Sequence, residues 1–158
     1  TGNDVTLEDI ARIADVFYIG GTKVGAMFGE AVVFTHGNMP KNFVTLVKQH
    51  GALLAKGWLL GVQFDTLFTD DLYCRIARHA NDAADRIREV LVERGYTLTF
   101  DAPTNQIFIT LDNATSERLQ RNVRLGFMEK ADDTHTVMRI CTSWATTDEQ
   151  VEQLIALL

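Results

Sequence analysis

The amino-acid sequence predicts an α/β protein in which part of a larger sheet is followed by a small α+β domain. Two short apolar segments, residues 15–19 and 30–34, have the composition of buried strands, and a loop with four glycines joins them. A long amphipathic helical pattern then covers residues 69–95. From residue 96 onward, short strand patterns alternate with helical ones.

The first 40 residues are expected to form the end of a larger domain. Thr6 can cap a helix over residues 6–14, since Glu8 and Asp9 follow in its first turn. The strands 15–19 and 30–34 come next. Two strands joined by a glycine loop are only marginally stable alone, so we expect them to belong to a sheet whose other strands are not in this chain.

Residues 41–95 are expected to form connecting helices. The pattern is helical over residues 41–68, but three glycines interrupt it and indicate breaks or close packing. The clearest helix begins after Thr69 and ends before Gly95. Its apolar stripe has spacings of three and four, at Leu72, Ile76, Ala80, Ala83, Ile87 and Leu91.

Residues 96–158 are expected to form a C-terminal small α+β domain, with helices on one face of an antiparallel or mixed sheet. The predicted strands are residues 97–101, 105–111, 127–131 and 136–144. The predicted helices are residues 115–125 and a last one from Thr147 to Leu158.

Composition narrows the function classes. Hydrophobic residues make up 46% and charged residues 23%, which is typical of a globular protein rather than a disordered one. A net charge of −6 favours neither nucleic acid nor an anionic membrane as partner, and no apolar stretch is long enough to span a bilayer. Cys74 and Cys141 are interpreted as buried thiols of a cytoplasmic protein. No metal site is expected, because the four histidines are scattered and no CxxC occurs.

Lys23 is the main candidate for chemistry. It lies in Gly-Gly-Thr-Lys-Val-Gly, directly after an apolar strand, and glycines allow a ligand to approach the main chain closely. A desolvated amine with a lowered pKa can attack a carbonyl and form a Schiff base. Pyridoxal 5′-phosphate (PLP) is the commonest cofactor bound in this way. The alternative is an ordinary surface lysine on a loop.

The segment FYIGGTKVGAMFGEAVVF resembles the Schiff-base lysine segment of the low-specificity L-threonine aldolase family. The similarity continues in pattern through GALLAKGWLLGVQF and FTDDLYCRIARHAN to the end of the chain. These enzymes are PLP-dependent and have the aspartate-aminotransferase fold, fold type I. The resemblance therefore implies that this chain is the C-terminal half of such an enzyme, with residues 1–40 as the end of the PLP-binding large domain.

The resemblance also implies roles for individual residues. Lys23 is the expected catalytic residue, which binds the cofactor as a Schiff base. Thr22 is expected beside the cofactor, and Gly20 and Gly21 would let the backbone pass close to it. Arg139 matches a family arginine that holds the substrate α-carboxylate, for which a planar guanidinium is well suited.

Lys56 lies where family members carry a glycine-rich stretch with an arginine and a glutamine. This sequence departs from that pattern, with Leu53 and Leu54 nearby. Two interpretations of Lys56 stay open: a cationic contact to the cofactor phosphate, or a solvated position on a helix, of which we favour the second.

The expected function is that of a PLP-dependent lyase of amino-acid metabolism, which cleaves L-threonine or a related β-hydroxy-α-amino acid to glycine and an aldehyde. The alternatives are another fold type I PLP enzyme, either a β-eliminating lyase or an aminotransferase, or a non-catalytic α+β regulatory or oligomerisation module. The family's ring-nitrogen aspartate, ring histidine and phosphate loop all lie upstream of the lysine, and only 22 residues precede Lys23. We therefore expect this chain to be inactive without its N-terminal half, and the intact protein to be a homo-oligomer, a dimer or tetramer.

Overall fold

The computed structural model describes residues 3–158, which divide into two compact units. The first unit extends to Cys74 and the second runs from Arg75 to Leu158, and each is described by itself. The domains expected from the sequence, 1–40, 41–95 and 96–158, remain predictions.

The first unit contains the two predicted strands and the helices around them. Its elements are α1 (Leu7–Ile13), β1 (Val16–Gly20), the 3₁₀ turn η1 (Thr22–Val24), β2 (Glu30–Phe34), α2 (Phe43–Gln49), α3 (Trp58–Phe68) and η2 (Thr69–Asp71). Thr6 caps α1 in a capping box with Asp9, as the sequence predicted. Between α2 and α3 the helical pattern breaks at Gly51, which has a φ of +72°, and Gly57 caps α3.

β1 and β2 form an antiparallel pair with Tyr18 opposite Val32 and Ile19 opposite Ala31. Within residues 3–158 these strands pair only with each other, as expected for two strands of an incomplete sheet. One face of the pair is apolar and open, since Tyr18 is 72% exposed and Val32 is 50% exposed. The buried apolar residues described in this unit are few: Val24, Phe64 and Leu67.

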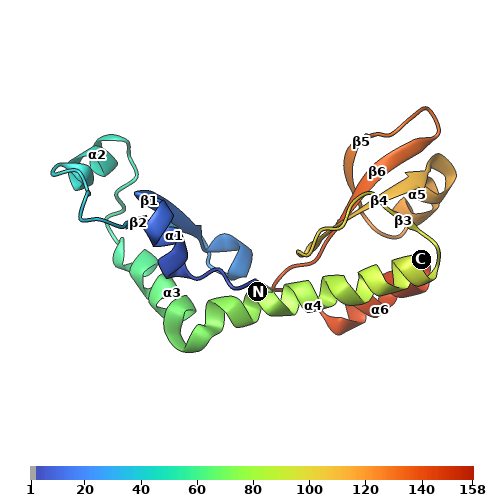
Figure 1. The fold of residues 1–158 in the computed structure, drawn as a ribbon, viewed down its shortest axis with the longest axis horizontal. Helices are drawn as coiled ribbons and strands as arrows, with labels where there is room; N and C mark the ends of the chain where they lie inside the picture. The colour runs from blue at the N-terminus through green and yellow to red at the C-terminus, as the bar shows by residue number, and fades with distance from the viewer. Residues whose placement is uncertain (1–2) are drawn as a thin grey trace. The chain divides into compact units, whose positions relative to one another are not determined.

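The second unit begins within the longest helix and continues as an α+β layer (Figure 1). Its elements are α4 (Leu72–Glu93), β3 (Thr97–Leu98), β4 (Gln106–Asp112), α5 (Asn113–Gln120), β5 (Gly126–Lys130), β6 (His135–Cys141) and α6 (Asp148–Leu157). Asp70 and Asp71, which precede α4, have left-handed φ angles of 51° and 56°, a conformation that aspartate tolerates better than most residues. Gly95 ends the helix region with a φ of +78°.

The four strands of the second unit form an antiparallel sheet in the order β3-β4-β6-β5. Ile107 pairs with Ile140 and Ile109 pairs with Met138, so these four side chains share one face. They are buried against α4, α5 and α6, together with Ile87, Leu91, Leu119 and Val151. The predicted layer of helices on one face of a sheet is confirmed, and the sheet is antiparallel. α6 lies along α4 (Figure 1), and Arg86 of α4 contacts Asp148 and Glu152 of α6.

Three predicted boundaries in this unit were wrong. The helix predicted over 115–125 is α5, Asn113–Gln120, because the Asp112 side chain accepts a hydrogen bond from the Thr115 backbone and caps the helix earlier. β3 contains only two residues instead of the predicted 97–101. β6 ends at Cys141 instead of residue 144, because the chain then turns, and the Thr146 hydroxyl accepts from the Ser143 backbone N–H.

No helix among residues 3–158 combines the length and hydropathy that crossing a bilayer requires.

Candidate functional site

Lys23 lies at the centre of a tight turn between β1 and β2. Residues Thr22–Val24 form one 3₁₀ turn, and the Gly21 carbonyl accepts hydrogen bonds from the backbone N–H groups of Val24 and Ala26, at 3.1 and 3.0 Å. Gly25 ends the turn in the left-handed region with a φ of 97°, a conformation that costs other residues about 1–2 kcal/mol. The glycine-rich pattern of the sequence therefore corresponds to a real backbone requirement.

The turn is packed closely against helix α3. An added Cβ on Gly21 would lie 2.8 Å from Ala26 Cβ and 3.1 Å from Phe64 Cζ, which leaves no space for a side chain. At Gly29, where φ is +90°, an added Cβ would overlap the Leu60 side chain. These two glycines are needed because α3 approaches the backbone on both sides of Lys23.

Two polar side chains also hold the turn, and sequence reasoning did not find either of them. The Gln63 Oε1 atom of α3 accepts a hydrogen bond from the Met27 backbone N–H at 2.7 Å. The Tyr73 hydroxyl donates to the Gly20 carbonyl oxygen at 2.9 Å. No local sequence signal could have identified them, because their partners lie 36 and 53 residues away in the chain.

The structure brings Lys23 and Thr22 together on the outer side of this turn. Both are exposed, whereas the neighbouring Val24 is only 5% exposed and anchors the turn. An apolar cavity of about 330 Å³ lies between α1 and the start of α4, with Ile19, Leu67 and Tyr73 in its lining, but Lys23 does not line it. The Lys23 amine is therefore accessible rather than desolvated in the described residues.

Lys56 lies in the turn that precedes α3 and is exposed. It is thus on the same unit as Lys23, at a solvated position. The exposure agrees with the simpler of its two interpretations, a lysine whose charge is in water.

Arg139 is on the sheet of the second unit, and is described separately from Lys23 because the two residues lie in different units. It pairs with Phe108 across β4 and with Gly126 across β5. Met138 and Ile140, its neighbours along β6, belong to the helix-covered core. Arg139 therefore projects from the opposite face of the sheet, as the sequence pattern predicted.

The guanidinium of Arg139 is only partly satisfied. Its Nη1 atom donates to Gln106 Oε1 at 3.1 Å. Among the residues that the structure describes, its Nε atom is buried and has no hydrogen-bond partner. Gly126 lies beside this atom, since a Cβ added to Gly126 would be 3.5 Å from Nε. Buried polar groups are nearly always paired, so an unpaired donor on a cationic side chain indicates a site for an anion.

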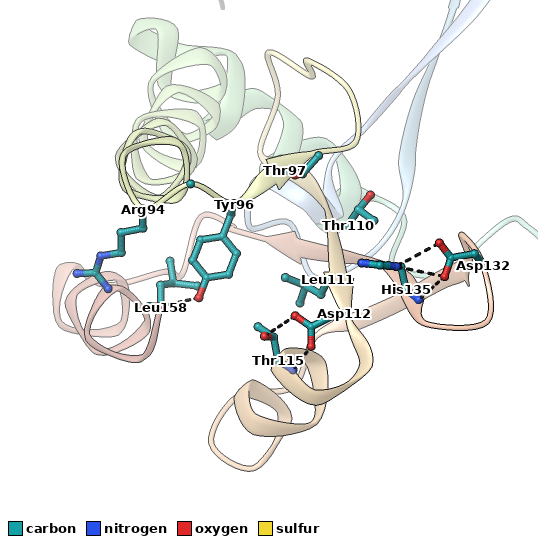
Figure 2. A pocket seen from close by; sticks show the side chains of 11 residues that line it. Arg94, Tyr96, Thr97, Thr110, Leu111, Asp112, Thr115, Asp132, His135 and Leu158 are labelled. Carbon is teal, nitrogen blue, oxygen red and sulfur yellow. Dashed lines mark hydrogen bonds and ion pairs between the residues drawn. The ribbon is translucent and has the colours of Figure 1, made fainter.

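A polar pocket of about 620 Å³ lies at the other end of the sheet, between β3, β4 and the β5–β6 turn (Figure 2). Figure 2 shows that its acidic groups are already engaged: Asp112 accepts from Thr115, and Asp132 faces His135. The hydroxyl and backbone N–H of Thr134, with a further contribution from His135, lower the pKa of Asp132 far below its ordinary value. These carboxylates cap a helix and close a turn, so we assign them structural roles.

Among residues 3–158, no group of three or more histidine, cysteine or acidic side chains could hold a metal ion. What the described residues offer is a primary amine on a rigid glycine turn and, on the second unit, a guanidinium with an unsatisfied donor. The first can bond to a carbonyl carbon. The second can bind a carboxylate or phosphate.

Comparison with known proteins gives consistent results. No model of a known protein family matches the sequence. The low-specificity L-threonine aldolase of Pseudomonas aeruginosa is 30% identical over 141 residues, which is 89% of this chain and 40% of that enzyme. The threonine aldolase structure from Leishmania major covers 99% of this chain with 40% identity and a TM-score of 0.93, and this chain covers 46% of it. A serine palmitoyltransferase from Sphingomonas wittichii matches with 18% identity and a TM-score of 0.62 over 95% of this chain.

The chain therefore spans about two fifths of the length of the curated relatives that it matches. The solved structures that it resembles are enzymes of fold type I. Its α/β fold is that of part of such an enzyme, in agreement with the fold class that the sequence predicted.

Proposed function

We propose that this chain is the lysine-bearing, C-terminal part of a PLP-dependent threonine aldolase, which cleaves L-threonine or a related β-hydroxy-α-amino acid to glycine and an aldehyde. The observation that carries the proposal is the backbone agreement with the Leishmania major threonine aldolase over 99% of the chain, at 40% identity. The accessible Lys23 amine, at the tip of a turn that α3 holds in place, supports it.

The residues of the turn fit the cofactor. Lys23 would hold PLP through its amine, and Thr22, exposed beside it, would contact the cofactor. The cofactor, when bound, withdraws electrons from the substrate α-carbon while the Cα–Cβ bond breaks. The hydroxyl proton of the substrate leaves as the aldehyde forms, and the α-carbon takes up a proton to give glycine. The Lys23 amine would be placed to take up the hydroxyl proton and to deliver a proton to the α-carbon.

Arg139 would bind the α-carboxylate of the amino acid. Its Nη1 atom is already bonded to Gln106, which limits rotation of the guanidinium plane. The unpaired Nε donor would then be free for the carboxylate. Fixing the carboxylate in this way orients the substrate, and in PLP enzymes orientation selects which bond at the α-carbon breaks.

The rest of the site must come from elsewhere in the complete protein. The first unit exposes large apolar side chains on its strands, helices and loops, including Ile13 at 87%, Met27 at 84% and Trp58 at 64% exposure. Apolar surface of this extent is typical of an interface. We propose that the missing N-terminal half and a second subunit of a homo-oligomer cover it, and that the protein is cytoplasmic.

The test uses the complete protein. With PLP bound, it should absorb near the visible range and lose this absorbance on borohydride reduction. Lys23 should then carry the cofactor in a peptide mass map. Lys23→Ala should abolish both the colour and threonine cleavage, while Lys56→Ala, the matched exposed lysine, should keep the colour. A colourless protein that stays colourless with added PLP would refute the proposal.

A further inference from the structure

We infer that Gln63 and Tyr73 are positioning residues for Lys23: their hydrogen bonds to the two ends of its turn hold the amine in the orientation that the reaction needs. This inference rests on the proposed function. The two bonds bracket the lysine, one at Gly20 before it and one at Met27 after it.

The turn needs such support because its own bonds are weak. It contains a single 3₁₀ turn, and 3₁₀ hydrogen bonds have poorer geometry than α-helical ones. Of residues 21–25, two are buried, Gly21 and Val24, and the other three are exposed. Without outside contacts, an exposed glycine-rich segment samples many backbone conformations.

Gln63 is held in one orientation. Its Oε1 atom accepts from the Met27 N–H, while its Nε2 atom donates to the Leu59 carbonyl oxygen at 3.3 Å. A backbone N–H can only donate and a carbonyl oxygen can only accept. Both contacts therefore require the same orientation of the Gln63 side-chain amide. Gln63 therefore connects the end of the lysine turn to the backbone of α3.

Tyr73 completes a second connection. Its ring stacks on Phe68 at a centroid distance of 5.7 Å, and Phe68 stacks on Phe64 at 6.2 Å. Phe64 in turn lies against Gly21. The three stacked rings therefore connect two adjacent residues of the turn: Phe64 packs against Gly21, and the Tyr73 hydroxyl bonds to the Gly20 carbonyl. Burial, with smaller contributions from Cys74 and Glu30, raises the pKa of Tyr73, so its hydroxyl stays protonated and can donate.

The experiment compares Gln63→Leu and Tyr73→Phe with two controls, Gln49→Leu and Tyr18→Phe, in the complete PLP-bound protein. Gln49 and Tyr18 are exposed residues of the same unit. Hydrogen exchange of the Met27 amide should become about tenfold faster in Gln63→Leu, as expected for the loss of one hydrogen bond. Gln63→Glu keeps the acceptor and should restore the slow exchange.

The second readout is the pH titration of the visible absorbance of the bound cofactor. A change in the orientation of Lys23 should shift its midpoint in both Gln63→Leu and Tyr73→Phe, together with a fall in kcat at nearly constant KM. The controls should titrate as the unmodified protein does. If exchange is unchanged, or if exchange is faster but the midpoint and kcat are not altered, the positioning role is refuted. A colourless unmodified protein would instead refute the proposed function, and with it the inference.

Discussion

Replacing Arg139 by methionine should leave the second unit about as stable as before or more stable, even though it removes a charged group with a hydrogen bond. The buried Nε atom of Arg139 has no partner among the described residues, and such a donor costs about 1–3 kcal/mol. The bond that is lost, from Nη1 to Gln106, contributes about 0.5–1.5 kcal/mol. The net change expected for Arg139→Met therefore lies between a loss of about 0.5 kcal/mol and a gain of about 2.5 kcal/mol.

Arg88 provides the matched control, because it is another largely buried arginine of the same unit. Its side chain is 15% exposed and forms an ion pair with Asp85. Its Nη2 atom donates to the carbonyl oxygens of Ala102 and Thr104 at 2.7 and 3.0 Å. Arg88→Met would leave these carbonyls without their donor, so it should destabilise the unit by about 2–4 kcal/mol.

The assay is native-state hydrogen exchange of the β4 and β6 amides in the complete, cofactor-free protein, which reports the free energy of opening around Arg139. With PLP added back, threonine cleavage should be lost in Arg139→Met and retained, at temperatures where the protein is folded, in Arg88→Met. The reasoning fails if Arg139→Met lowers the opening free energy by more than about 1 kcal/mol. Arg139 would then be a structural residue.

Three further predictions concern stability. Gly29→Ala should destabilise the lysine turn by about 2–5 kcal/mol, because it adds backbone strain and overlap with Leu60. The control is Gly37→Ala, where φ is +63° and the space is open, so denaturant unfolding of this variant should show only the cost of backbone strain. Ile109→Ala removes a side chain with 0% exposure at the centre of the sheet and should cost about 2–5 kcal/mol in urea unfolding; a cost below 1 kcal/mol would mean that the site collapses around the cavity. The pKa of Asp132 lies below its ordinary value of 3.8 because nearby hydroxyl and amide donors bind the carboxylate. Its contribution to stability is thus complete above pH 3.8 and is lost as the pH falls below that value, and Asp132→Asn should flatten this decline in thermal melts.

The elements that the sequence predicted well are those with local causes. Thr6 and Thr147 cap α1 and α6 through side-chain bonds to residues three positions away. Apolar composition and flanking glycines predict the strands around Lys23, and spacings of three and four predict the core face of α4. Lys23 itself stands out in the sequence because a lysine between glycines, directly after an apolar strand, is unusual. All these signals lie within a few residues of the feature that they predict.

Only the tertiary structure decided how the site residues are supported. The sequence could not indicate that Gln63 and Tyr73 hold the lysine turn, because those bonds join residues 36 and 53 positions apart. Nor could it indicate that Arg139 keeps a buried donor without a partner among the described residues while Arg88 forms three hydrogen bonds, since both are simply arginines in periodic segments. Periodicity and capping depend on neighbours along the chain, whereas hydrogen-bond satisfaction and burial depend on which distant segments pack together.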